Sequence, residues 1–478
     1  MFNDRLSLRW AIFSCCVSLL FSACAPALPK HPDQLAYPAL EFNLPDIERV
    51  QLPNGIQLYL KEDNELPLVQ VTALLGTGSI NVPQQYVGFE RLFSETWRTG
   101  GTAHYEPSQL EERLDQLAAN LGASMGFYSS QLDLSMRSED LEEGLGIFAD
   151  MLRRPEFADS SLELARLKAL ENVRRQNDLP RSIAQRLLMA SLYPDHPLGD
   201  SPTLESLSRI KREQFVAFHD SYFAPNNLRL AVSGDFDRQE LLSRLDDLFG
   251  DWPQKNIDQQ QIPALQPSSP ARLQMVDKDI AQTTVLIGDV GLTKDNPDQY
   301  AVRVMNFILG GGGFNSRMMQ EIRSNRGLAY SAYSYFQIGR RLPGPFVAST
   351  ETRNDTVVQT LELMRSIISD LRDQPVSETE LRVAKESLVN SFVFGFDDSH
   401  AIVSQQMRLD LFDYPPDYLS GFRDRIAAVT VEDVLRASRT YLHPERQQIV
   451  LVGDSDAFEK DLDSFGLEVL HVPTEELP

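Results

Sequence analysis

The stretch Gly310-Gly-Gly-Gly-Phe-Asn-Ser-Arg-Met-Met-Gln-Glu-Ile-Arg-Ser-Asn-Arg-Gly-Leu-Ala-Tyr-Ser-Ala-Tyr-Ser334 carries more information about the fold than any other part of the chain. It opens with four glycines, which tolerate positive φ angles and allow close approach of the backbone to other groups. Ser316 is typical of a helix N-cap, and Gly327 of the left-handed residue that ends a helix. The alternating residues that follow predict a strand. Arg323 in the last helical turn and Tyr330 on the strand are therefore expected to meet.

The chain contains an internal repeat of about half its length. Tyr222 and Tyr441 end similar helical stretches, and their offset is 441 − 222 = 219. Gly234 and Gly453 end similar strands, and their offset is 453 − 234 = 219. A constant offset through a helix, a loop and a strand indicates duplication.

Each half places strands before long amphipathic helices and closes with another strand, which predicts an α+β fold. In the first half, helices are predicted near residues 88–98, 107–122, 138–152, 159–177 and 204–221. We expect an N-terminal domain over residues 45–252 and a C-terminal domain over residues 272–478. Residues 253–271 are rich in Pro, Gln and Ser and lack periodicity, so they are predicted to link the domains.

The glycine-led stretch resembles the C-terminal domain of the pitrilysin, insulinase and mitochondrial processing peptidase family of zinc peptidases. The resemblance covers roughly residues 45–470 and implies two homologous processing-peptidase-like metallohydrolase domains, with helices packed on an antiparallel-rich mixed sheet. It also implies that Arg323 and Tyr330 hold substrate backbone and support the oxyanion of the tetrahedral intermediate. Gly310, Gly311, Gly312 and Gly313 would form a loop for substrate recognition. The alternative is structural: Arg323 caps its helix and Tyr330 belongs to the core.

Active members of that family carry His-x-x-Glu-His on an early helix, where the histidines bind zinc and the glutamate activates water. The corresponding stretch here, Gly88–Thr102, contains no histidine. Counting back from Gly-Thr without a gap places the ligand positions on Leu92 and Thr96 and the base on Glu95. A second register, with one inserted glycine, places the motif on Arg91, Ser94 and Glu95.

The third zinc ligand of the family, a glutamate, corresponds to Asn172, eight residues before the proline of the Asp178-Leu-Pro180 turn. An amide oxygen is a poor zinc ligand. No two of the seven histidines have ligand spacing on one helix, so we expect this chain to bind no metal or other cofactor. The histidines are His31, His104, His196, His219, His400, His443 and His471.

The N-terminus is predicted to be a targeting segment. Residues 10–23 form an uncharged, mostly apolar run of 14, whereas a membrane-spanning helix needs about 20. The run leads into Leu-Phe-Ser-Ala-Cys24, which resembles a bacterial lipobox, so residues 1–23 are expected to be a lipoprotein signal peptide. Cys24 would carry the lipid and residues 24–44 the tether. Ala25 in place of aspartate implies an outer-membrane lipoprotein facing the periplasm of a Gram-negative bacterium.

Composition limits the partners. The formal net charge is −23 and no Lys/Arg-rich run occurs, which argues against a nucleic-acid ligand. The resemblance implies a catalytic partner of the same family that carries His-x-x-Glu-His and the zinc, with an extended peptide as substrate and the membrane contacted through the lipid. This chain would then be the non-catalytic, peptide-binding subunit. Two alternatives remain: a catalytically dead scaffold or binding lipoprotein of the cell envelope, and a self-sufficient peptidase with an unorthodox site.

Overall fold

The computed structural model describes residues 43–258, 261–266 and 269–477. The predicted signal peptide, the lipidation site Cys24 and residues 25–42 of the tether lie outside the described residues. No helix among the described residues is long and apolar enough to cross a membrane.

The first half of the unit Leu44–Pro478 is built on a six-stranded mixed sheet with the order β1-β2-β6-β3-β5-β4. The β2–β6 pair is parallel and the other pairs are antiparallel. The strands are β1 (Glu48–Gln51), β2 (Gln57–Glu62), β3 (Leu68–Leu75), β4 (Asn120–Met125), β5 (Ser130–Arg137) and β6 (Leu228–Gly234).

Helices of the first half pack on one face of this sheet around a core that includes Phe93, Trp97, Phe148 and Phe215. The apolar stripe at i, i+3, i+4 and i+7 on the first of them explains why that helix packs here. The helices of this layer are α2 (Phe89–Thr99), α3 (Pro107–Gln116), α4 (Leu141–Arg153), α5 (Asp159–Arg174), α7 (Leu204–Arg209), α8 (Arg212–Tyr222) and α9 (Arg238–Phe249). The remaining helix of this half, α6 (Pro180–Leu192), packs on the second sheet.

The second half repeats the arrangement with the order β12-β7-β11-β8-β10-β9, in which β12, β7 and β11 are parallel. Its strands are β7 (Arg272–Asp277), β8 (Gln282–Val290), β9 (Ala329–Phe336), β10 (Pro345–Arg353), β11 (Gln448–Gly453) and β12 (Glu468–His471). Its α-helices are α10 (Gln299–Asn306), α11 (Val357–Asp373), α12 (Glu378–Ser391), α13 (Ser399–Leu411), α14 (Phe422–Ala428) and α15 (Val431–Tyr441).

The matching strand orders confirm the α+β fold of two homologous domains. One local prediction is wrong: the helical pattern over 107–122 ends at Gln116, because Ala118 adopts a positive φ of 49° and residues 120–125 form the edge strand β4. The predicted helix over 204–221 is two helices, α7 and α8.

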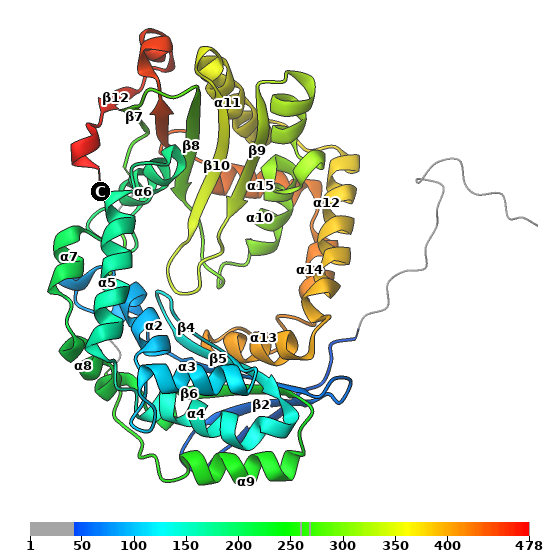
Figure 1. Cartoon of the computed structure of the whole chain (residues 1–478). Coiled ribbons are helices and arrows are strands. Elements are labelled where there is room, and N and C mark those ends of the chain that lie inside the picture. The colour runs from blue at the N-terminus through cyan, green and yellow to red at the C-terminus, as the bar shows by residue number, and fades with distance from the viewer. Residues whose placement is uncertain (1–42, 259–260, 267–268, 478) are drawn as a thin grey trace, which may run out of the picture. The chain divides into compact units, whose positions relative to one another are not determined.

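Each half donates one helix to the other half's sheet, as Figure 1 shows for α6 and α13. Leu188 of α6 packs in a cluster with Leu286 of β8 and Val450 of β11. In return, Met407 of α13 packs with Leu74 of β3 and other residues of the first sheet. Side chains alternate along a strand, so apolar residues such as Leu74 and Leu286 also point to the face turned away from each sheet's own helices, where the exchanged helices cover them.

A half-buried histidine, His400, connects α13 to the first sheet. The His400 ring lies 2.8 Å (Nε2) from the Thr72 hydroxyl on β3 and 3.0 Å (Nδ1) from the Ser233 hydroxyl on β6. Thr72 in turn donates a hydrogen bond of 2.6 Å to Asp133 on β5. Burial lowers the pKa of His400 and outweighs the opposing effects of Asp398 and Asp133. Burial also lowers the pKa of His219.

These histidines make stability depend on pH in a defined direction. Below about pH 6.5 the unfolded chain takes up protons that the folded chain resists, so the free energy of unfolding falls as the pH falls through this range. We expect His400→Gln, whose amide keeps hydrogen-bonding capacity at a cost of about 1 kcal/mol, to make this decline shallower. Urea denaturation at pH 5.5, 6.5 and 7.5, followed by tryptophan fluorescence, measures it. An unchanged slope in the variant would contradict the assignment.

Candidate functional site

The Gly310–Ser334 stretch does not form a regular α-helix. After α10, residues Phe307–Gly311 wind as a π-helix, shown by the 2.8 Å bond from the Gly312 N–H to the Phe307 carbonyl. A short 3-10 turn follows, and Met319–Asn325 again winds as a π-helix. Such windings occur frequently at functional sites.

The structure explains why two of the four positions are occupied by glycine. A Cβ on Gly310 would lie 2.4 Å from the Ser334 backbone nitrogen, so the helix can approach β9 closely only with glycine here. Gly313 has a φ of 56°, in the left-handed region, and the space around its missing Cβ is open. The loop is therefore required for the fold, and its predicted part in substrate recognition remains a prediction.

Arg323 and Tyr330 meet at one exposed point. The Arg323 guanidinium carbon lies 4.4 Å from the centre of the Tyr330 ring and 4.7 Å from that of the Phe314 ring. Gly327, with a φ of 61°, ends the helix and turns the chain into β9. Tyr330 is 82% exposed, so the alternative that placed it in the core is wrong. Phe314 is also well exposed, and the sequence offered no signal that it contacts Arg323.

This arrangement keeps the Arg323 guanidinium available. Among the residues that the structure describes, no carboxylate forms an ion pair with it, whereas the nearby Arg326 pairs with Glu321 at 3.7 Å. Stacking on aromatic rings holds a guanidinium by cation–π attraction, worth about 0.5–1 kcal/mol at exposed sites. Its N–H groups can still donate hydrogen bonds to a carbonyl or an oxyanion.

A bidentate ion pair anchors the start of the helix that carries Arg323. Arg317 donates from Nε and a terminal nitrogen to the two carboxylate oxygens of Glu380 on α12, at 2.7 and 3.2 Å. Burial acts to raise the pKa of Glu380, but the bonds from Arg317 and Ser377 outweigh it and hold that pKa below its ordinary value. The helix is thus fixed at both ends, by this pair and by Gly327.

On α2, the structure favours the second of the two zinc-motif registers. Leu92 and Thr96, the ligand positions of the ungapped register, are fully buried in the core. Arg91 and Glu95 lie one turn apart on the outer face, toward α5. Burial of Leu92 and Thr96 thus favours Arg91 and Glu95 as the counterparts of the ligand positions, as expected if the extra glycine after the helix shifts the count by one.

The residues at these positions do not fit zinc. Arg91 carries a permanent positive charge, and the Ser94 hydroxyl donates to the Glu90 carbonyl at 2.6 Å. Glu95 accepts a hydrogen bond of 2.5 Å from the Lys168 ammonium on α5, one helical turn before Asn172. Within residues 43–258, 261–266 and 269–477, no three His, Cys, Asp or Glu side chains form a cluster that could hold a metal ion.

An open groove runs past the former zinc positions. Arg91 and Asn172 both line it, together with residues of the α5–α6 turn and the start of α6. The other lining residues are Glu171, Val173, Arg175, Gln176, Asp178, Leu179, Ser182, Gln185, Arg186 and Pro202.

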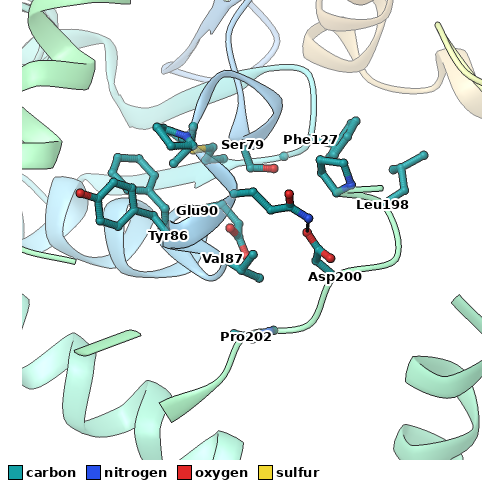
Figure 2. A pocket seen from close by; sticks show the side chains of 15 residues that line it. Ser79, Tyr86, Val87, Glu90, Phe127, Leu198, Asp200 and Pro202 are labelled. Atoms are coloured by element: carbon teal, nitrogen blue, oxygen red, sulfur yellow. Dashed lines mark hydrogen bonds between the residues drawn. The ribbon is translucent and has the colours of Figure 1, made fainter. Parts of the chain in front are cut away.

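A separate pocket lies at the N-terminal end of α2 (Figure 2). Figure 2 shows Tyr86, Val87 and Glu90 on one side of it and Phe127, Leu198 and Asp200 on the other. Burial raises the pKa of Glu90, against bonds from backbone N–H groups of the first helical turn. Glu90 lies in the first turn of α2, after the N-cap Gly88, where a negative charge interacts favourably with the helix dipole.

Comparisons with known proteins agree with the fold. A family model described as insulinase (peptidase family M16) matches residues 59–204, and one described as peptidase M16 inactive domain matches residues 209–388. An uncharacterized zinc protease of Mycobacterium leprae is 26% identical over 408 residues, covering 81% of this chain and 87% of the relative. A non-peptidase homolog of Helicobacter pylori is 26% identical over 342 residues, covering 70% of this chain and 77% of the relative.

Solved structures show the same architecture. The crystal structure of a peptidase M16 inactive domain from Pseudomonas fluorescens superposes with a TM-score of 0.77 at 26% identity, covering 85% of this chain and 98% of that one. A structure described as a protease from Helicobacter pylori gives a TM-score of 0.76 at 19% identity, covering 86% and 100% of the two chains.

The favoured register predicts which substitutions rebuild a metal site. The variant Arg91→His, Ser94→Glu, Glu95→His, Lys168→Ala and Asn172→Glu should bind about one zinc per chain, since it supplies two imidazoles and a carboxylate on facing helices. The control Leu92→His with Thr96→His should bind none and should lose several kcal/mol of stability, because it buries imidazoles in an apolar core. Zinc analysis after dialysis and urea denaturation test both. Zinc in the control variant alone would restore the ungapped register.

Proposed function

This chain belongs to the insulinase family of peptidases, peptidase family M16, and on that premise we propose that it is the non-catalytic, peptide-binding subunit of a periplasmic zinc metalloendopeptidase. The observation that carries the proposal is the exposed contact between Arg323 and Tyr330. A protein that served only as a scaffold would not need to keep a guanidinium in contact with an exposed phenol. It would also not need to anchor the helix that carries this guanidinium.

The chemistry assigned to this pair is hydrogen-bond donation. The Arg323 guanidinium and the Tyr330 hydroxyl would donate to the carbonyl oxygen of the scissile peptide bond as negative charge develops on it. Preorganised donors of this kind act where charge appears in the transition state, and removal of one such donor elsewhere costs about 10²–10³ in kcat. Phe314 would hold the guanidinium in place through its ring.

The metal and the general base would come from a second chain. The former zinc positions here carry Arg91, Ser94, Glu95 and Asn172, which cannot supply them. We therefore assign the zinc ligands and the water-activating glutamate to a family member with an intact His-x-x-Glu-His helix. This chain would contribute the donors and part of the surface that binds an extended peptide.

The proposed location follows from the N-terminal sequence. Residues 1–23 would direct export, Cys24 would be lipidated, and the chain would be held at the outer membrane facing the periplasm. A single acyl chain anchors weakly and two or more anchor stably, so full lipidation would keep the subunit at the membrane.

The test removes the donors without removing the fold. We expect Arg323→Ala combined with Tyr330→Phe to lower kcat of the purified complex about 100-fold or more while the complex still assembles, since both side chains are at the surface. Cleavage of a fluorogenic peptide by the complex, purified through a tag on this chain, measures the effect.

The matched control is Arg326→Ala combined with Tyr335→Phe, which removes a guanidinium and a phenol hydroxyl from the same helix end and the same strand. We expect near wild-type activity from it. Full activity in the Arg323/Tyr330 variant would instead identify the chain as a scaffold that kept the fold without a part in the chemistry.

A further inference from the structure

The groove beside the positions assigned to the zinc motif is lined by three arginines, two carboxylates and several uncharged polar side chains. It extends from Arg91 and Pro202 along the α5–α6 turn to Leu179. Leu179 also lines a second groove, which continues over Arg181 to Gln282 and Glu351 of the second half. Small-molecule pockets span about 300–1,000 Å³, and the first groove, which is open to solvent, has a cavity volume of about 630 Å³. Its size and length suit an extended chain better than a single ion.

The acidic groups around this groove are already neutralised. Glu171 pairs with Arg174 at 3.7 Å, Asp178 with Arg175 at 3.0 Å, and Glu95 with Lys168 at 2.5 Å. In these three ion pairs, each carboxylate is matched by one cation.

Arg91 is left over. Its side chain is exposed, and in the described part of the chain no carboxylate forms an ion pair with it. The nearest acidic neighbour in sequence, Glu90, lines the separate pocket at the start of α2 and accepts backbone N–H bonds there. Asn172, Gln176, Ser182 and Gln185 add uncharged hydrogen-bonding groups along the groove. The groove therefore offers a guanidinium together with neutral donors and acceptors.

Resting on the proposed peptide-binding function, we propose that this groove binds extended peptides that carry a carboxylate, and that Arg91 is the residue that recognises it. A guanidinium matches a carboxylate through two parallel N–H···O bonds, the strongest hydrogen bonds that an uncharged groove could gain. The groups beside Arg91 bind the peptide backbone. A position that bound a metal cation in active relatives would thus bind an anion here.

The proposed preference for acidic peptides is opposite to the preference expected from the net charge of the protein. With a net charge of −23, long-range attraction favours cationic peptides. At physiological ionic strength the screening length is about 8 Å, so a contact with Arg91 outweighs the distant surface charge. A preference for acidic peptides at 0.15 M salt is therefore specific to the groove, and raising the salt should leave much of it in place.

The experiment measures binding to the full-length lipoprotein alone, in detergent, by fluorescence anisotropy. The probes are Gly-Ser-Ala-Glu-Ser-Ala-Glu-Gly peptides labelled at the N-terminus with an uncharged BODIPY dye, the same peptide with glutamine for both glutamates, and each of these with a free or amidated C-terminus. We expect a carboxylate on the peptide to improve its affinity about tenfold. Comparison of the peptides with a free C-terminus and those with glutamates shows whether the protein recognises the terminal carboxylate or a side-chain carboxylate.

The variant Arg91→Gln should lose this preference, and Arg91→Lys should restore part of it. The matched control, Arg209→Gln, removes an exposed arginine on α7 that is already paired with Glu205; neither residue lines the groove, so the variant should keep the preference. Equal affinity for all four peptides, no binding of any, or an unchanged preference in Arg91→Gln would overturn the inference. Failure of the proposed function would show instead in the activity of the Arg323/Tyr330 variant, which this assay does not involve.

Discussion

The structure depends on one constraint: helices of its own half cover only one face of each six-stranded sheet, so the apolar residues on the other face need a helix from the other half. Alternation along β3 sends Val69, Val71 and Ala73 into the core of the first half, while Leu74 points to the other face. That face is covered by α13, which comes from the second half, and α6 covers the second sheet in the same way. The exchange buries both sheets and makes the two halves a single cooperative unit.

The same constraint explains what has been kept and what has changed around α2. The buried stripe of this helix, with Phe89, Phe93 and Trp97, is needed for the core of the first half whatever its outer face does. The outer face is free to vary, and here it carries an arginine and a Lys168–Glu95 ion pair where zinc peptidases hold their metal. An exposed ion pair of this kind contributes little to the free energy of unfolding, so the fold is compatible with other residues at these positions.

The sequence allowed the main features of the second half to be predicted. The offset of 219 between Gly234 and Gly453 identified the duplication, and the strand orders of the two sheets agree with it. Ser316, Gly327 and the alternation after it were sufficient to place Arg323 beside Tyr330. These predictions worked because they rest on local rules of helix termini and strand periodicity.

Other features depended on contacts between distant residues and could not be predicted. One inserted glycine after α2 shifted the zinc-motif count, and only the burial of Leu92 and Thr96 decides between the registers. The π-helical winding, the contact of Phe314 with Arg323 and the crossing of α6 to the second sheet have no short-range signal. The sequence did not reveal strand β4, because small residues such as Gly122 and Ala123 do not show the alternation of apolar and polar side chains that marks a strand.

The central claim, that this chain is one half of a two-chain zinc peptidase, is tested most directly by isolating it from its own membrane. The full-length chain would be tagged at its C-terminus, extracted in mild detergent and purified, and its companions would be identified and quantified by mass spectrometry. The account predicts one companion in about equal amount that carries His-x-x-Glu-His, and zinc in the purified complex. Recovery of the chain alone, or with envelope proteins that lack that motif, would contradict it.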